Sequence, residues 1–379
     1  YLNLIKKGEV TEKELNDKVR RILRLVFRTN MAKERHFGSF GTEEHALAGR
    51  TIAQQGIVLL QNKKNVLPVD ASKVKRVLVV GENAVKRMTV GGGSSSLKAK
   101  YEVSPLEGIK ARLGDGAEVI YSPGYASPAV KEQDVLGAEE PDKMEIDADA
   151  LRNDAVKWAK DADVVFFVGG LNKNDGQDCE GNDRSSLSLP YEQDQLIAEL
   201  AKANPNTVVV IISGNAVAMP WVKQVPAIVE AWYSGTEAGN ALASILFGDV
   251  NPSGKLPFTF PVKLEDNGAH ALGEHPGDSI NVKYNESIFV GYRWADKQKK
   301  TKPLFAFGHG LSYTTFAYGK ATATKKSLTA DETITFTVLV KNTGSREGSE
   351  VVQLYIGDKK SALPRPIKEL KGFSKVKLA

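Results

Sequence analysis

One carboxylate, Glu180, stands in a glycine-bearing loop that the sequence predicts between a buried strand and a helix. The loop covers residues 171–189 and contains the run CEGNDR at residues 179–184. In open α/β sheets, ligands meet the carboxyl ends of parallel strands, so this loop would project Glu180 from the expected functional edge. A carboxyl group in that position is placed for chemistry rather than for packing. The alternative is that Glu180 is one more solvated acid among 46 Asp and Glu residues, since exposure is the norm for this residue type.

The elements that must position this loop alternate between strand and helix over residues 42–261. Runs rich in β-branched residues predict buried strands, each ending in glycine, and Pro190 to Asn204 predicts a helix. The alternation predicts a parallel sheet with helices on both faces. Right-handed crossovers would then gather the loops after the strands along one edge. The predicted strands are Val74 to Gly81, Asp163 to Gly170, Thr207 to Gly214 and Ala227 to Gly235.

The segments before and after this sheet differ from it in pattern. Residues 11–28 begin with a capping box, Thr11 with Glu14, and continue with apolar residues at helical spacing, which predicts a helix with one face to bury. At the other end, residues 333–340 and 350–356 alternate like strands of an antiparallel sandwich, with turn residues at 342–344. Such a sandwich needs roughly seven strands over about 100 residues, and only about 60 residues follow Tyr318. We expect an incomplete sandwich.

Composition excludes several classes of protein. The chain has 379 residues, is 41% hydrophobic and carries a net charge of +5. Its longest apolar runs are far shorter than the roughly 18 residues that span a bilayer, so we expect no membrane insertion. The basic residues are not arranged along one face with interleaved aromatics, which argues against nucleic-acid binding. The single Cys179 has no partner for a disulfide and no CxxC or histidine neighbour for a metal.

Other chemistry-bearing residues are weaker candidates. The glycine and serine run at residues 91–96 lacks both the P-loop ending and the dinucleotide glycine spacing, and it is equally compatible with a plain turn. Trp232 could stack on a sugar, but core packing is the favoured interpretation. His309 is interpreted as a structural, hydrogen-bonded histidine, because the five histidines show no ligand spacing.

Five motifs in one order carry a resemblance to a known family. The chain resembles glycoside hydrolase family 3, of the β-glucosidase type, over nearly its whole length. The resemblance rests on the loop around Glu180 with Leu187, Leu189 and Pro190, on residues 231–239, 251–257 and 290–293, and on the run FGHGLSY at 307–313.

The resemblance implies a layout in which most of a catalytic (β/α) barrel is missing from this chain. Residues 1–28 would be the last helix of that barrel and 29–41 a linker. Residues 42–261 would be an α/β sandwich domain carrying the acid/base loop, 262–317 a connecting loop region, and 318–379 an incomplete fibronectin type III-like domain. The expected fold class is α/β, a parallel-sheet sandwich domain followed by a partial β-sandwich.

The resemblance also implies roles for individual residues. Family members are retaining hydrolases with an aspartate nucleophile on the barrel and a glutamate acid/base on the second domain; Glu180 matches that glutamate and no residue here matches the nucleophile. Ser94 and Ser95 would border the aglycone side of the pocket. Arg184 would bond the sugar or, as the favoured alternative, hold the loop beside Asp183. No metal or other cofactor is implied, because two carboxylates suffice for the reaction.

The sequence leaves alternatives open. We expect the acid/base part of a retaining, exo-acting β-glucosidase acting on terminal β-linked sugars, completed by a barrel domain or chain. A carbohydrate-binding or structural subunit without turnover is the rival class. A flavodoxin-like nucleotide-binding module would fit the sheet but lacks phosphate-loop residues. A periplasmic or secreted location is favoured, and the cytoplasm stays open, since one thiol is compatible with each compartment.

Overall fold

The computed structural model describes residues 1–29, 38–89, 93–95, 97–127, 147–173, 176–181, 183–278, 280–298, 301–329 and 331–379. Part of the predicted linker and Gly91, Gly92, Ser96 and Asn182 lie outside these ranges. Two compact units divide the chain, Tyr1–His45 and Ala46–Ala379.

The first unit contains helices α1 (Leu2–Lys6) and α2 (Glu12–Thr29). The predicted capping box is confirmed, because the Glu14 carboxylate accepts the Thr11 backbone N–H at 2.8 Å and the Thr11 hydroxyl accepts the Glu14 N–H at 3.3 Å. The predicted apolar residues lie along α2, yet none of its residues is buried in this structure.

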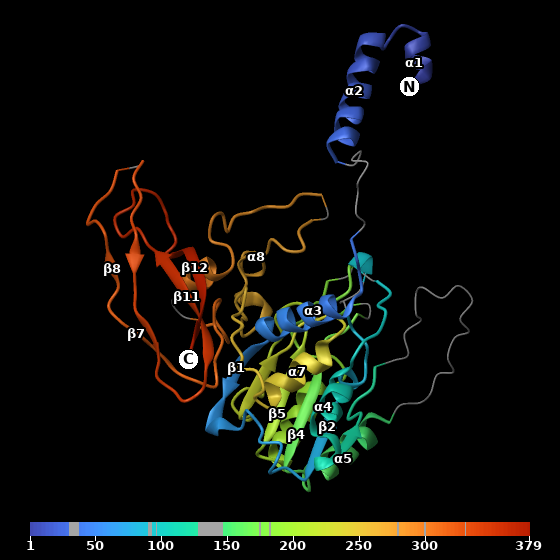
Figure 1. Cartoon of the computed structure of the whole chain (residues 1–379), viewed down its shortest axis with the longest axis vertical. Coiled ribbons are helices and arrows are strands. Elements are labelled where there is room, and N and C mark those ends of the chain that lie inside the picture. The colour runs from blue at the N-terminus through green and yellow to red at the C-terminus, as the bar shows by residue number, and fades with distance from the viewer. Residues whose placement is uncertain are drawn as a thin grey trace. The chain divides into compact units, whose positions relative to one another are not determined.

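A six-stranded sheet forms the centre of the second unit (Figure 1). Its strand order is β1-β6-β5-β4-β2-β3, with β1 antiparallel to β6 and the other neighbours parallel. The predicted parallel sheet is therefore confirmed, with one antiparallel edge strand added. The strands are β1 (Val58–Asn62), β2 (Arg76–Val80), β3 (Glu118–Ser122), β4 (Val164–Gly170), β5 (Thr207–Ile212) and β6 (Ala227–Glu230).

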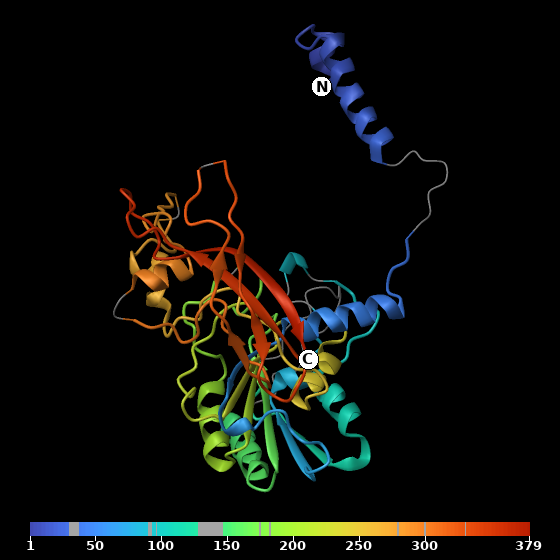
Figure 2. The ribbon, with the colours of Figure 1, turned by 60° about the vertical axis from the view of Figure 1, so that its left-hand side comes forward.

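Helices cover both faces of the sheet because its central strands are apolar on both faces. Successive residues point to opposite faces: Phe166 belongs to one core and Phe167 to the other. Helices α4 and α7, with part of α3, pack on the first face, and α5 and α6 on the second (Figures 1 and 2). These helices are α3 (Glu43–Gly56), α4 (Pro105–Leu113), α5 (Ala148–Ala159), α6 (Gln193–Ala203) and α7 (Ala238–Leu246).

The base of the predicted loop after β4 is fixed by backbone geometry and by one side chain. Gly170 has φ of 115°, and a Cβ there would lie 2.4 Å from the Ile212 carbonyl oxygen, so only glycine fits. Gln193 accepts the Gly170 N–H at 2.8 Å and donates to its carbonyl at 2.9 Å. The helix begins three residues later than predicted, because Tyr191 and Glu192 adopt positive φ.

The C-terminal segment forms antiparallel strand pairs, as its alternation predicts. The predicted strand over residues 333–340 is instead two short strands, because the chain changes partner: β9 pairs with β8 and β10 with β7. The predicted strand at 350–356 lies within β11, which pairs with β12. Helices α8 (Gly268–Ala271) and α9 (Tyr292–Lys297) precede these strands. The strands are β7 (Phe316–Tyr318), β8 (Thr322–Ala323), β9 (Phe336–Thr337), β10 (Val340–Asn342), β11 (Gly348–Ile356) and β12 (Glu369–Leu378).

Candidate active site

Glu180 lies in the predicted place, exposed in the loop between β4 and α6. Its Oε2 accepts the backbone N–H of Ser94 at 2.7 Å. Ser94 belongs to a short 3₁₀ turn, Gly93–Ser95, in the connection after β2, the neighbouring strand. Hydrogen bonds from the Ser94 hydroxyl and then from its N–H lower the pKa of Glu180. These hydrogen bonds therefore stabilise the charged form of Glu180.

The other serine candidate, Ser95, lies beside Ser94. Ser95 is exposed in the same short turn, one residue beyond Ser94. The two loops that carry Ser94 and Glu180 therefore meet at the carboxyl edge of the sheet, as the parallel arrangement predicts.

Arg184 is held by the connection after β5. Its Nη2 donates to the Ala216 carbonyl at 2.8 Å and to the Asn215 side-chain oxygen. Burial lowers the pKa of its guanidinium, and its Nη1 is buried with no hydrogen-bond partner among the described residues. Asp183 instead approaches His275 Nε2 at 3.4 Å. Arg184 thus contacts Asn215 and Ala216, whereas Asp183 contacts His275, and a bond from Arg184 to a sugar stays a prediction.

Asp178 is a polar residue of this loop that the sequence reasoning missed. Its carboxylate accepts the Gly214 N–H at 2.6 Å, the Tyr233 hydroxyl at 2.9 Å and the Asn215 side-chain amide. The available signal was a second acid two residues before Glu180. Nothing in the sequence paired that acid with Asn215, which lies 37 residues away.

A fully buried carboxyl group, Glu230, ends strand β6 beneath this network. It accepts the Trp232 N–H at 3.3 Å and contacts the Ser213 hydroxyl at 3.4 Å. Burial raises the pKa of Glu230 well above its usual value, and it also raises the pKa of Tyr233. Because glutamate is usually exposed, the burial of Glu230 could not be predicted from the sequence.

Two further candidates, His309 and Trp232, make packing contacts and hydrogen bonds within the fold, in agreement with the favoured interpretations. His309 Nε2 lies 2.8 Å from the Leu60 carbonyl oxygen, and its ring stacks on Phe305. Trp232 packs edge-on against Phe258 and donates its indole N–H to the Gly56 carbonyl at 3.0 Å. Cys179 is a free, half-buried thiol.

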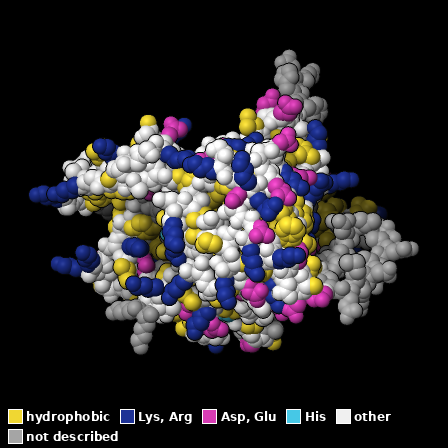
Figure 3. Space-filling view, turned by 90° about the horizontal axis from the view of Figure 1, so that it is seen from below, with side chains coloured by type: hydrophobic (Ala, Val, Ile, Leu, Met, Phe, Trp, Pro, Cys, Tyr) yellow, Lys and Arg dark blue, Asp and Glu magenta, His cyan; other side chains and the backbone are white. Residues whose placement is uncertain are grey.

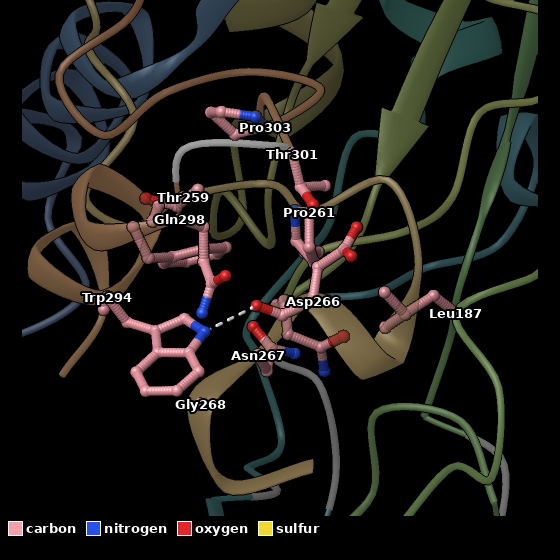
Figure 4. A pocket seen from close by; sticks show the side chains of 16 residues that line it. Leu187, Thr259, Pro261, Asp266, Asn267, Gly268, Trp294, Gln298, Thr301 and Pro303 are labelled. Atoms are coloured by element: carbon pink, nitrogen blue, oxygen red, sulfur yellow. Dashed lines mark hydrogen bonds between the residues drawn. The ribbon is translucent and has the colours of Figure 1, made fainter. Parts of the chain in front are cut away.

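A cavity of about 550 Å³ lies beside the segment that Arg184 contacts (Figure 4). Leu187, Asn215 and Ala216 line one part of it, and Asn267 and Trp294 line another. The Trp294 indole N–H donates to the Asp266 carbonyl at 3.0 Å (Figure 4). The cavity therefore lies between the loop that carries Glu180 and the region that follows the sheet.

Charge distribution, metal-ligating side chains and helix hydrophobicity point to no second class of site among the described residues. On the face drawn in Figure 3, Lys and Arg side chains are scattered among Asp and Glu. No group of three or more His, Cys, Asp or Glu residues within the described ranges is arranged to hold a metal ion. No described helix combines the length and apolar character needed to cross a bilayer.

Comparison with known families identifies the origin of this arrangement. Residues 57–313 match the glycosyl hydrolase family 3 C-terminal domain, and residues 350–379 match the fibronectin type III-like domain. The chain belongs to glycosyl hydrolase family 3. The resemblance and the fold class predicted from the sequence are thereby confirmed.

Curated relatives of this family 3 chain are β-glucosidases. It is 51% identical to β-glucosidase BoGH3A of Bacteroides ovatus over 387 residues, which is 100% of this chain and 50% of the relative. It is 34% identical to the periplasmic β-glucosidase of Salmonella typhimurium, covering 99% of this chain and 50% of that protein. The chain thus spans about half the length of these relatives.

Solved structures of β-glucosidases share the fold. The β-glucosidase DesR of Streptomyces venezuelae, in complex with D-glucose, superposes with a TM-score of 0.85 at 29% identity, covering 100% of this chain and 59% of that one. The β-glucosidase of Bifidobacterium adolescentis gives a TM-score of 0.81 at 33% identity, covering 99% and 52%.

Proposed function

We propose that this chain supplies the general acid/base, Glu180, of a retaining, exo-acting β-glucosidase whose aspartate nucleophile lies on a barrel outside this sequence. The observation that carries the proposal is the placement of Glu180. In a family 3 chain, it is an exposed carboxylate at the carboxyl edge of the sheet, tied to the adjacent loop by Ser94. The chain's share of its relatives, about half, supports a partner that holds the other carboxylate.

The chemistry of a retaining glycosidase divides into two displacements. The nucleophile attacks the anomeric carbon of a terminal β-linked glucoside while Glu180 gives its proton to the departing oxygen. Glu180 then takes a proton from water as the water attacks the glycosyl-enzyme, which restores both carboxyl groups. This requires the two carboxyl groups to lie about 5 to 5.5 Å apart.

The state of Glu180 in this chain supports a role completed by a partner. A general acid must be protonated near the working pH, whereas the Ser94 hydrogen bonds lower the pKa of the exposed Glu180 carboxyl. Covering the loop with the barrel would remove water and bring a second carboxylate close, and both effects raise the pKa of a carboxyl group. The barrel would thus tune Glu180 as well as supply the nucleophile.

The test introduces Glu180→Gln into this chain and mixes the chain with the half of the Bacteroides ovatus relative that it does not cover. We expect hydrolysis of alkyl glucosides, whose leaving groups need protonation, to fall by about 10²- to 10⁴-fold. Glucosides with strongly activated leaving groups should lose far less in the first displacement. Asp183→Asn, in the same exposed loop, is the matched control and should keep its activity on both substrate types. Unchanged alkyl glucoside hydrolysis by Glu180→Gln would refute the role of Glu180.

The alternative function is a carbohydrate-binding or structural subunit without turnover. It is favoured if the assembled pair binds glucosides and shows no hydrolysis in the unsubstituted form. A periplasmic or secreted compartment belongs to the proposal, supported by the name of the relative from Salmonella typhimurium. Fractionation of cells that express the longer protein tests the compartment.

A further inference from the structure

We propose that Asp178 is the positioning residue for Glu180: it fastens the loop that carries the acid/base to the strand ends of β5 and β6. This inference rests on the proposed role of Glu180. The Glu180 side chain is exposed, and its hydrogen bond to Ser94 links it to a neighbouring loop. The position of Glu180 therefore also depends on how the backbone on either side of it is fixed.

Asp178 ties the incoming side of the loop to two strand ends. The Gly214 N–H and the Asn215 amide come from the connection after β5, and the Tyr233 hydroxyl comes from the connection after β6. The Asp178 N–H also donates to the Asn172 carbonyl at 3.1 Å, which closes the start of the loop onto the end of β4. Three donors on one carboxylate make charge-assisted hydrogen bonds, which are stronger than neutral ones.

Arg184 ties the outgoing side of the loop to the same connection. It donates to the Ala216 carbonyl and to the side-chain oxygen of Asn215. Asn215 is therefore shared, since its NH₂ donates to Asp178 and its oxygen accepts from Arg184. Glu180 stands between two anchors on one short segment, residues 214–216.

The contacts of Asp178 favour a positioning role over a direct catalytic one. Both of its oxygens accept hydrogen bonds, Oδ1 from Asn215 and Oδ2 from Gly214 and Tyr233. Because each oxygen of Asp178 already accepts a hydrogen bond from the strand ends, its carboxylate is engaged in holding the loop. It acts through the loop.

The first measurement is hydrogen exchange, followed by mass spectrometry, on the 379-residue chain. In Asp178→Asn, an amide NH₂ must face at least one of the three donors, so peptides from residues 171–189 and 213–216 should exchange at least tenfold faster. Asp183→Asn, three residues beyond Glu180, should leave both peptides unchanged, because its contact with His275 is an exposed ion pair, which contributes little to stability. Tyr233→Phe removes one donor and keeps the ring, so it should give a smaller increase in exchange. This variant supplies the test if Asp178→Asn does not fold. Unchanged exchange in both Asp178→Asn and Tyr233→Phe overturns the anchoring.

The second measurement is kinetic and uses the chain combined with the missing half of the enzyme. Displacing an acid by about 1 Å can cost about 100-fold in rate. Asp178→Asn should therefore lower kcat/KM for alkyl glucosides by about 10- to 100-fold and spare activated glucosides. In a Glu180→Gln background it should cause no further loss, because a positioning residue acts through the residue it positions.

The outcomes separate this inference from the proposed function. Equal losses on both substrate types, or losses that multiply in the double variant, overturn the positioning role of Asp178. If Glu180→Gln itself has no effect, the proposed function fails, and the positioning role fails with it. Faster exchange in Asp178→Asn would in that case still establish Asp178 as an anchor of the loop.

Discussion

Among single residues, Glu230 makes the clearest prediction about pH. The folded chain holds its carboxyl group fully buried with a raised pKa, whereas the unfolded chain releases this proton above about pH 4.5. The folded state therefore binds the proton more tightly than the unfolded state does. As pH rises from about 4.5 towards the raised pKa of the folded state, this group destabilises the fold. Glu230→Gln, which mimics the neutral acid, should gain stability relative to the unsubstituted chain by up to about 1.4 kcal/mol per pH unit.

Urea unfolding of the sheet-containing unit between pH 5 and pH 8 checks this slope. Glu265→Gln is the control, because Glu265 is exposed, and its stability difference from the unsubstituted chain should stay flat. A difference between Glu230→Gln and the unsubstituted chain that does not change with pH would mean that Glu230 is ionised in the fold.

For single residues, position in the chain could be predicted from the sequence, but contacts and burial could not. Glu180 could be located because a loop between a buried strand and a helix is a local pattern. The contacts of Asp178 and Arg184 with Asn215 depend instead on how β4 and β5 lie side by side, and their partners are 31 to 37 residues apart. Burial of Glu230 is likewise a property of the folded sheet, since Glu is usually exposed.

Among the elements, the contact between α4 and α7 depends on two glycines. Helix backbones approach closely here, because a Cβ on Gly108 would lie 2.1 Å from the Gly239 carbonyl oxygen and one on Gly239 would lie 2.0 Å from the Ser104 carbonyl oxygen. Gly108→Ala should therefore destabilise the unit by about 1–3 kcal/mol through overpacking, despite the better helix propensity of alanine.

Gly49→Ala in α3 is the matched control, since nothing lies within 4 Å of a Cβ at that helical position. It should stabilise the chain by about 0.5–1 kcal/mol. Thermal or urea unfolding of both variants compares the two positions. If Gly108→Ala were as stable as Gly49→Ala, the helices would not be locked in close contact.

The elements themselves were predictable in proportion to how buried they are. The central strands β2, β4, β5 and β6 follow continuous apolar runs. The edge strand β3 is only half-buried and gives no comparable signal, and the direction of β1 depends on its pairing with β6. In the C-terminal segment, the change of partner between β9 and β10 is set by neighbours distant in sequence, so one predicted strand becomes two.

For the whole molecule, the relevant fact is that this chain spans about half of its family 3 relatives. Helix α2 has an apolar face on which Val19 is 42% exposed and Ile22 63% exposed. The proposed barrel would cover that face. Exposed apolar patches commonly mark the surfaces through which a protein binds a complementary surface.

The last prediction follows from this stripe. Val19→Ser with Ile22→Ser should change the free energy of unfolding of the 379-residue chain by no more than about 0.5 kcal/mol, as surface substitutions usually do. The same pair should weaken binding of the chain to the uncovered half of the Bacteroides ovatus relative by about 10- to 100-fold, because burying such side chains contributes about 1.5–3 kcal/mol each when complete. Arg20→Ser with Arg24→Ser alters other faces of the same helix and should leave binding within about threefold. Calorimetric titration of the two halves measures both affinities, and equal binding by the two double variants would place the barrel contact elsewhere on the chain.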